Sequence, residues 1–287
     1  KPMQERVVLH STYTPLGSVG EQGLSAWVID AAPLASYSEQ GLTRVVIRDV
    51  TTEHQADQVR RDFVANASHE LRTPMAIING YLENLLDDDL LDDPVMSRRF
   101  LETMRKHGQR ISLLVEDMLV ISKMESGDAM LLNMDSFSIK ECVNDVCDRL
   151  EAMISQQQAV VDISVVPDDL CMMGDRFYWT QVIFNLMENA LKQNPQGPLK
   201  LVVQAEKSED QIKISICDNG VGIPAADLPY IFKRFYRVEK HHSQSEIKGT
   251  GLGLSIVRRA IEAHGGKITA SSIPGQQTCF VISLPVE

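Results

Sequence analysis

Two stretches in the middle of the chain carry apolar residues at alternating spacings of three and four positions, within residues 71–85 and 104–121. This period aligns apolar side chains along one stripe of an α-helix, so each stretch predicts a long helix. The acidic segment DDDLLDDP separates the stretches and is typical of a turn. We therefore predict an antiparallel helical hairpin within residues 52–130, with these residues in its seam: Leu71, Met75, Ile78, Leu82, Leu85, Met104, His107, Ile111, Leu114, Met118 and Ile121.

A single hairpin of this kind leaves part of its apolar seam uncovered. Heptad seams are fully buried only where they meet the seams of further helices. Two hairpins from two copies of the chain can close around one core as a four-helix bundle. The pattern therefore predicts a homodimer formed through the helical hairpin.

The segments on either side of the hairpin carry other patterns. Residues 1–51 contain three short β-rich stretches, at 6–13, 24–29 and 43–49. Three strands bury too little apolar surface for an independent domain, so we predict that they belong to a larger one.

Residues 131–287 mix helical and strand periods and predict an α/β domain. The predicted helices are residues 139–153, 176–192 and 252–264, and the predicted strands are residues 160–165, 199–205, 211–217, 267–271 and 278–284.

Composition narrows the classes of function. The 287 residues include 28 basic and 39 acidic side chains, a net charge of −11, which disfavours binding to nucleic-acid phosphates. Five cysteines without CxxC pairing predict free thiols in a reduced setting, rather than a disulfide framework or a zinc knuckle. No apolar run approaches the roughly 20 residues that cross a bilayer. Because the first residue is lysine, we expect a fragment of a longer protein.

A histidine lies on the first predicted helix, outside the apolar seam. His69 is followed by Glu70, whose carboxylate can orient or deprotonate an imidazole. Thr73 lies one turn later on the same face. Pro74 removes one backbone hydrogen bond and is expected to bend the helix, which would open the histidine to a large partner. A lone helical histidine is most often a surface residue, but these neighbours favour a reactive one.

Three polar residues share one face of the predicted helix at 176–192. Asn185 and Asn189 are four positions apart, and Lys192 follows three positions later. An amide oxygen can ligate Mg²⁺, and a lysine can meet phosphate as a point charge. Buried asparagines on an amphipathic helix are the simpler explanation of this segment taken alone.

The motif DNGVGI follows an apolar predicted strand. Asp218 can accept a hydrogen bond from an adenine amino group, because an ionised carboxylate is only an acceptor. Gly220 and Gly222 permit a tight turn and a close approach of backbone to ligand. Cys217, directly before the motif, is expected to be buried as a small apolar residue.

The motif KGTGLGLSIV places Gly249, Gly251 and Gly253 before a helix N-terminus, where free N–H groups bind anions. It fits neither the P-loop nor the dinucleotide fingerprint. The segment between the two glycine motifs has aromatic anchors and several cations, and its polar end at residues 241–247 suits a lid over a nucleotide. The cations are Lys233, Arg234, Arg237 and Lys240.

In this order the motifs resemble those of the sensor histidine kinases of two-component signalling. SHELRTP, residues 68–74, is similar to the phosphoacceptor box, and the four later stretches are similar to the N, G1, F and G2 boxes of the ATP domain. The resemblance covers residues 52–287 and implies a dimeric four-helix bundle followed by a two-layer α/β sandwich, as in gyrase and the Hsp90 chaperones. Residues 1–51 resemble the end of a PAS sensor domain.

The resemblance also implies ATP and Mg²⁺ as ligands and a response regulator as partner. His69 would be phosphorylated, Glu70 would assist removal of its proton, and Thr73 would place water for dephosphorylation of the response regulator. Asn189 would ligate magnesium, and Arg237 would neutralise charge on the transferring phosphoryl group. The implied nucleotide contacts are Asn185, Asn189, Lys192, Asp218, Gly220, Gly222, Gly249, Thr250, Gly251, Leu252 and Gly253. The module would be cytoplasmic, within a parent protein anchored in the bacterial membrane.

Two other classes of protein share parts of this pattern. ATP-driven conformational machines carry a water-activating glutamate four positions before the magnesium asparagine, where this chain has Asn185. A pseudokinase would bind nucleotide only to set a conformation, which the intact phosphoacceptor box and glycine motifs argue against. A protein dominated by phosphatase activity through Thr73 stays open, because the balance of activities depends on domain arrangement.

Overall fold

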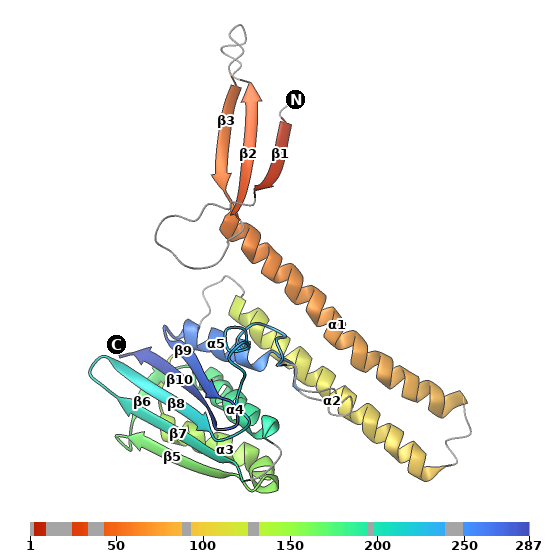
Figure 1. The fold of residues 1–287 in the computed structure, drawn as a ribbon, viewed down its shortest axis with the longest axis vertical. Coiled ribbons are helices and arrows are strands. Elements are labelled where there is room, and N and C mark those ends of the chain that lie inside the picture. The colour runs from red at the N-terminus through yellow and green to blue at the C-terminus, as the bar shows by residue number, and fades with distance from the viewer. Residues whose placement is uncertain are drawn as a thin grey trace. The chain divides into compact units, whose positions relative to one another are not determined.

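The computed structural model divides the chain into two compact units, Lys1–His69 and Glu70–Glu287 (Figure 1). The predicted lid at residues 241–247, Lys240 and most of the predicted acidic turn lie outside the described residues. The predicted domain boundaries after residues 51 and 130 stay predictions. The residues that the structure describes are 3–9, 25–33, 43–87, 93–125, 132–194, 198–238 and 249–286.

The first unit contains an antiparallel sheet with the strand order β1-β2-β3. Its strands are β1 (Met3–Leu9), β2 (Ser25–Pro33) and β3 (Thr43–Asp49). The helix that follows is tied to this sheet, since Val50 N donates to Ala26 O at 2.8 Å. The sheet agrees with three predicted strands, although β1 begins and ends earlier than the pattern indicates. Its assignment to a PAS domain stays a prediction.

Two long helices form the predicted hairpin, α1 (Thr51–Asp87) and α2 (Pro94–Glu125). Asp93 caps α2 by accepting a hydrogen bond from Val95 N at 2.9 Å. Within the second unit, the ring centroids of Tyr81 and Phe100 lie 4.9 Å apart, and Glu70 pairs with Arg110. From one contact to the other, the residue number increases along α1 and decreases along α2. The two helices are therefore antiparallel, as predicted.

The predicted seam is only partly buried within one chain. Leu85 and Leu114 are 5% and 0% exposed, whereas Met75 and Leu82 are 54% and 45% exposed. Exposed apolar side chains along one stripe of a helix are typical of a surface that another protein chain covers.

The rest of the second unit is the predicted α/β domain. Its elements are β4 (Asp135–Ser138), α3 (Ile139–Gln156), β5 (Val160–Val166), β6 (Cys171–Gly174), α4 (Arg176–Gln193), β7 (Lys200–Lys207), β8 (Gln211–Asp218), α5 (Gly253–Ala263), β9 (Lys267–Ile273) and β10 (Gln277–Pro285). The sequence pattern indicated all of them except β4 and β6, which pair with each other in a two-stranded sheet.

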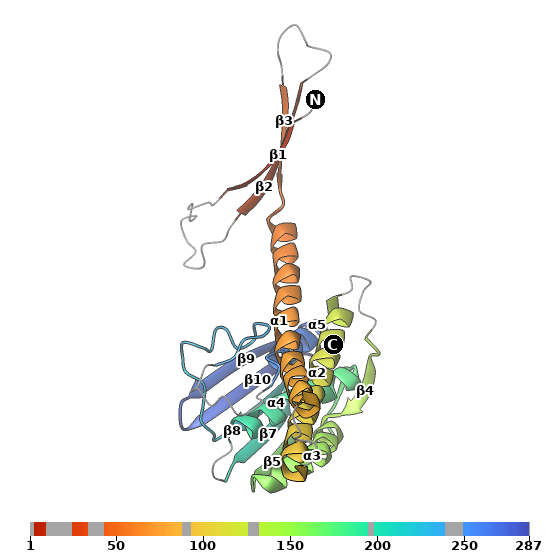
Figure 2. The same cartoon turned by 90° about the vertical axis from the view of Figure 1, so that its right-hand side faces the viewer.

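A five-stranded sheet with the order β5-β7-β8-β10-β9 forms one layer of this domain. Only β5 and β7 run parallel. Helices α3, α4 and α5 lie together on one face (Figures 1 and 2). The strands alternate accordingly: Ile212, Ile214 and Ile216 of β8 are buried, whereas Lys213 and Ser215 between them are not. The predicted two-layer α/β sandwich is therefore confirmed.

Helix α4, which carries the first nucleotide motif, is fixed at its N-terminus by Asp175. The Asp175 carboxylate accepts hydrogen bonds from Phe177 N and Asn133 N, both at 3.0 Å. Its own N–H donates to His264 Nε2 at 2.9 Å, which links the start of α4 to the end of α5. This hydrogen bond fixes α4 relative to α5, the helices that come before and after the glycine motifs in the sequence.

Candidate phosphoacceptor and nucleotide site

His69 lies on an exposed part of α1. Its side chain and that of Thr73 are both exposed, as expected for positions outside the apolar seam. Helix α1 continues across Pro74, which is buried. The local bend at this proline stays a prediction.

Glu70 is held by an ion pair across the hairpin. Arg110 Nη2 lies 2.8 Å from Glu70 Oε2, and the two side chains are 17% and 31% exposed. A charge-assisted hydrogen bond at a partly buried position restricts the carboxylate to a narrow range of orientations. The sequence did not indicate Arg110, because a partner on another helix leaves no local spacing pattern.

Asp218 ends strand β8 as one of the few buried acidic residues of the described part. It is 8% exposed and accepts hydrogen bonds from Gly220 N at 2.9 Å and Asn194 Nδ2 at 3.4 Å. Burial raises the pKa of the Asp218 carboxyl, and these hydrogen bonds oppose the shift. Both hydrogen bonds go to Oδ1, which leaves Oδ2 as an acceptor for a ligand amino group.

Asn194 organises this end of the site, although the sequence analysis assigned it no role. Its Nδ2 donates to Ala190 O at 2.7 Å as well as to Asp218, and its Oδ1 accepts from Val221 N at 2.5 Å. The side chain is 6% exposed. It therefore connects the end of α4 to the first glycine motif.

The first glycine motif needs glycine because neighbouring atoms lie too close to its backbone for a side chain. A Cβ on Gly220 would lie 1.9 Å from the Asn194 amide oxygen, which is a severe steric overlap. Gly222 has a φ of +73°, and a Cβ there would lie 2.6 Å from Pro274 Cα. Next in the chain, Ile223 N donates to Ser272 Oγ at 2.8 Å, which joins the motif to β9.

The second glycine motif leads into α5, whose N-terminus is open. Leu252 is the N-cap residue and makes no side-chain capping hydrogen bond. Gly251 has a φ of +76° and touches the backbone of Phe235, whose N–H donates to Gly251 O at 2.8 Å. Uncapped N–H groups at a helix N-terminus favour phosphate, in agreement with the predicted anion site.

Asn185 lies beside this helix start. A Cβ on Gly253 would be 3.4 Å from Asn185 Oδ1, and Asn185 Nδ2 is buried without a hydrogen-bond partner among the described residues. A buried amide N–H of this kind can donate to a phosphate oxygen. Asn189 is one turn further along α4 and only partly buried.

Lys192 does not project freely toward this region. Its Nζ pairs with Glu188 Oε1 at 2.8 Å, one turn earlier on α4. A phosphate would have to draw Lys192 away from that carboxylate. Arg237, at the end of the aromatic segment, is exposed.

Asp117 of α2 reaches the second glycine motif. Thr250 Oγ1 donates to Asp117 Oδ2 at 2.7 Å and accepts from Leu252 N at 3.2 Å. Burial raises the pKa of the Asp117 carboxyl. The Thr250 hydrogen bond lowers it, Glu188 raises it further, and Lys192 lowers it. Helix α2 therefore presents a carboxylate to residues that the sequence assigns to nucleotide phosphates.

No group of three or more His, Cys, Asp and Glu side chains converges as a metal site among the residues that the structure describes. Asn189 as the magnesium ligand stays a prediction. In the same described ranges, no helix is long and apolar enough to cross a bilayer.

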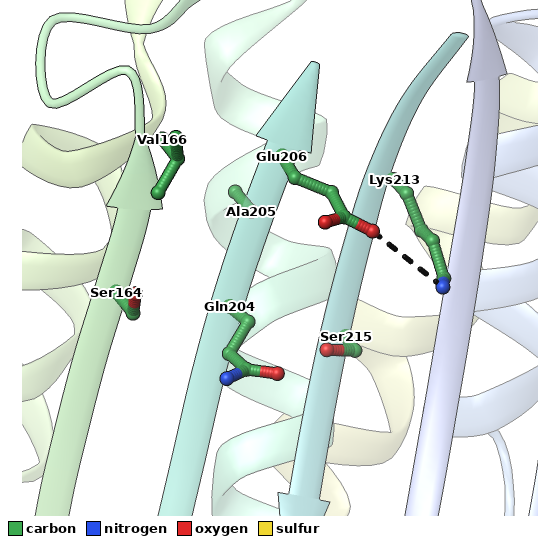
Figure 3. A pocket seen from close by; sticks show the side chains of 7 residues that line it. All are labelled: Ser164, Val166, Gln204, Ala205, Glu206, Lys213 and Ser215. Carbon is green, nitrogen blue, oxygen red and sulfur yellow. Dashed lines mark ion pairs between the residues drawn. The ribbon is translucent and has the colours of Figure 1, made fainter. Parts of the chain in front are cut away.

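A small hollow lies elsewhere, on the open face of the sheet (Figure 3). Gln204 and Ser215 line it, and Glu206 pairs with Lys213 across it at 3.6 Å. None of the predicted nucleotide contacts lines this hollow, so it is separate from the candidate site.

The expectation of free thiols is wrong for two cysteines. Cys217 and Cys279 form a disulfide between β8 and β10, and Cys217 is partly exposed rather than buried. The sequence pattern missed the bond because the two positions are 62 residues apart and meet only through strand pairing. Cys142, Cys147 and Cys171 are free.

Two protein family models match the chain, one over its helical hairpin and one over its α/β domain. Residues 59–127 match the His Kinase A (phospho-acceptor) domain, and residues 174–287 match the histidine kinase-, DNA gyrase B-, and HSP90-like ATPases. The chain belongs to the sensor histidine kinases.

Similar histidine kinases include the sensor histidine kinase WalK of Bacillus subtilis, 39% identical over 84% of this chain and 39% of the relative. The sensor protein kinase WalK of Staphylococcus aureus is 35% identical over 84% of this chain and 57% of the relative. The chain thus spans about two fifths to three fifths of the length of these relatives.

Solved structures of other histidine kinases have the same fold. The histidine kinase AdeS of Acinetobacter baumannii is 29% identical, covers 76% of this chain and 97% of its own, and superposes with a TM-score of 0.59. The histidine kinase ThkA, solved in complex with the response regulator TrrA, covers 99% of this chain and 78% of its own at a TM-score of 0.63. Because ThkA is only 22% identical, it supports the fold alone.

Proposed function

We propose that this chain transfers the γ-phosphoryl group of ATP to His69 and then to an aspartate of a response regulator. The observation that carries the proposal is an exposed histidine, followed by a fixed carboxylate on a helical hairpin, in a chain that also carries both glycine motifs beside Asp218 and the start of α5. A nucleotide-dependent scaffold would have no need of the histidine and its acidic neighbour.

The ATP domain supplies contacts for each part of the nucleotide. Asp218 accepts the adenine amino group, and Asn194 and Gly220 fix its carboxylate. The N-terminus of α5, which has no side-chain cap, would bind the phosphates. Asn189 would hold Mg²⁺, which when bound neutralises charge on the phosphate oxygens.

Phosphoryl transfer requires a proton acceptor for the imidazole. As the bond between His69 and phosphorus forms, the bond from phosphorus to the leaving ADP oxygen breaks. The imidazole proton passes to Glu70, which the ion pair with Arg110 holds in place. We assign Arg237 to charge on the transferring group, because this chemistry depends on positioning and electrostatics.

The helical hairpin is proposed to form a homodimer. Met75 and Leu82 belong to the predicted seam and are largely exposed within one chain. A second hairpin would cover them and complete a four-helix bundle. The response regulator is the proposed acceptor of phosphate from His69, and Thr73 would place water for hydrolysis of the phosphorylated response regulator. A membrane anchor outside this chain stays a prediction.

The proposal is tested by incubation of the chain with Mg²⁺ and γ-labelled ATP. The native chain should acquire acid-labile label, and His69→Gln should acquire none. His54→Gln is the matched control, because His54 lies on the same helix, and it should be labelled like the native chain. Nucleotide binding without label on the native chain would overturn the kinase proposal and favour a conformational role.

A further inference from the structure

Cys217 and Cys279 occupy directly paired positions on neighbouring antiparallel strands. The register of β8 and β10 places them opposite each other, with their Cα atoms 4.1 Å apart and a disulfide between them. Strand pairing thus holds the two sulfur atoms together in the folded domain. The proposed kinase mechanism does not use either residue.

Both cysteines lie on the open face of the sheet. Along β8 the buried residues alternate with Lys213 and Ser215, and Cys217 continues this second set. Cys279 alternates in the same way with the buried residues Thr278 and Phe280 of β10. Figure 3 views this face and shows the helices behind the sheet. Both residues are partly exposed, so soluble oxidants and reductants can reach them.

The pair adjoins the nucleotide cradle. The next register pair along the strands is Asp218 with Thr278, both of which are buried. The sequence separation of 62 between the cysteines spans both glycine motifs and the aromatic segment between them. A bond between the cysteines therefore links the two strands, β8 and β10, between which both glycine motifs lie in the sequence.

We propose that Cys217 and Cys279 form a reversible thiol–disulfide site that tunes nucleotide affinity. The tuning of affinity, but not the redox chemistry, rests on the proposed nucleotide site. The oxidant is a peroxide or a small-molecule disulfide. With a disulfide, one thiolate attacks it to give a mixed disulfide and a released thiol. The second thiolate then displaces the other thiol, so that two cysteines are oxidised and one disulfide is reduced. A phosphine or dithiol reverses the reaction.

The oxidised chain binds nucleotide more tightly. Strand ends open locally in folded domains, and a covalent link beside the register pair Asp218 and Thr278 limits that opening in the nucleotide-free state, so that less ordering remains to be done when the nucleotide binds. We expect an affinity about fivefold higher in the oxidised state, within the usual range of coupling between two sites. By linkage, bound nucleotide should make the disulfide harder to reduce by the same factor.

The remaining cysteines provide an internal control. Burial raises the pKa of the thiols of Cys142 and Cys147, which slows their oxidation at neutral pH. Cys171 is exposed and lies on β6, outside the sheet that holds the pair. A redox response specific to the pair can therefore be separated from general thiol oxidation.

The first test counts alkylated cysteines by mass spectrometry of the intact, denatured chain. After treatment with oxidised glutathione, three cysteines should react with iodoacetamide before reduction and all five after it. Peptide mapping should place the two protected sites at Cys217 and Cys279. Alkylation of all five without a reductant, or a different protected pair, would overturn the proposal.

The second test measures the affinity of a fluorescent ADP analogue for the full chain in both redox states. The native chain and Cys171→Ser should show the fivefold difference, and Cys217→Ser and Cys279→Ser should each show one affinity in both states. Equal affinities in the two states of the native chain would overturn the coupling. Serine variants that respond like the native chain would do the same. Absence of any binding would instead contradict the proposed nucleotide site, and the alkylation result would still decide the redox chemistry.

Discussion

The Thr250 hydroxyl donates a hydrogen bond of 2.7 Å to the Asp117 carboxylate, and this contact joins the second glycine motif to helix α2. Thr250 is itself assigned to nucleotide binding, as is Lys192, whose charge lowers the pKa of Asp117. A nucleotide would bring further negative charge to this region. Under the proposed function, Asp117 and the nucleotide phosphates would compete for the Thr250 hydroxyl, which donates to Asp117 in this structure.

Replacement of Asp117 by alanine is expected to raise nucleotide affinity. The variant frees Thr250 from this competing acceptor, so the dissociation constant of a fluorescent ADP analogue should fall by about threefold to tenfold. Glu116→Ala is the matched control, because Glu116 is the exposed neighbour on α2, and its dissociation constant should stay that of the native chain. An unchanged constant for Asp117→Ala would contradict the competition.

The same contact predicts a pH dependence. Because burial raises the pKa of Asp117 in the docked state, docking favours the protonated carboxyl and weakens as pH rises through that pKa. Nucleotide should therefore bind the native chain less tightly as the pH is lowered through the raised pKa of Asp117, and the loss should be smaller in Asp117→Ala. Parallel titration curves for the two proteins would show that another group is responsible.

Asp218→Asn should separate nucleotide binding from stability. The amide keeps an oxygen for Gly220 but loses the charged acceptor, and loss of one such hydrogen bond of about 1.5–3 kcal/mol weakens binding about tenfold to a hundredfold. Burial raises the pKa of Asp218, so ionisation destabilises the folded domain as pH rises above the unfolded value. The variant should therefore melt at neutral pH no lower than the native chain. Asp210→Asn, at an exposed position, should change neither property. A large loss of melting temperature in Asp218→Asn would contradict this assignment.

Gly220→Ala should damage both stability and binding. The new Cβ would overlap the Asn194 amide at 1.9 Å, so Asn194 must leave Asp218 and Val221. Overpacking of this kind costs about 1–3 kcal/mol, which calorimetry would detect as a lower melting temperature. Gly80→Ala meets nothing within 4 Å on helix α1 and should stabilise the chain slightly. Native stability of Gly220→Ala would show that the Asn194 contact is not rigid.

The helices and strands that carry the site were predictable wherever apolar residues repeated at one constant spacing over a long segment. Helix α4, predicted at 176–192, extends over Arg176–Gln193 because its buried residues repeat at helical spacing. Strands β4 and β6 were missed because four residues each are too few to establish alternation. Glycine motifs were also predictable, since a required φ or close approach restricts the residue type.

The partners of the site residues were not predictable from one sequence. Asn194 was missed because its function comes from Asp218 and Val221, which are distant in the chain and meet it only in the fold. Arg110 and Asp117 lie on α2 among ordinary charged residues, and only packing reveals their contacts. The disulfide depends on strand register, which the spacing of cysteines does not encode.

Met75→Lys should dissociate the proposed dimer. Met75 belongs to the predicted seam and is 54% exposed within one chain. A symmetric dimer would bury two copies of Met75, one from each chain. Loss of about 2 kcal/mol per buried side chain, together with the cost of a buried charge, should weaken the dimer by at least about a hundredfold. Asn84→Lys introduces the same charge on an exposed position of α1 outside the seam and should leave the dimer intact. Sedimentation velocity across a range of concentrations measures both. A Met75→Lys chain as dimeric as the native one would place the dimer interface elsewhere, because a lysine at the centre of the predicted seam could not be buried there without a partner.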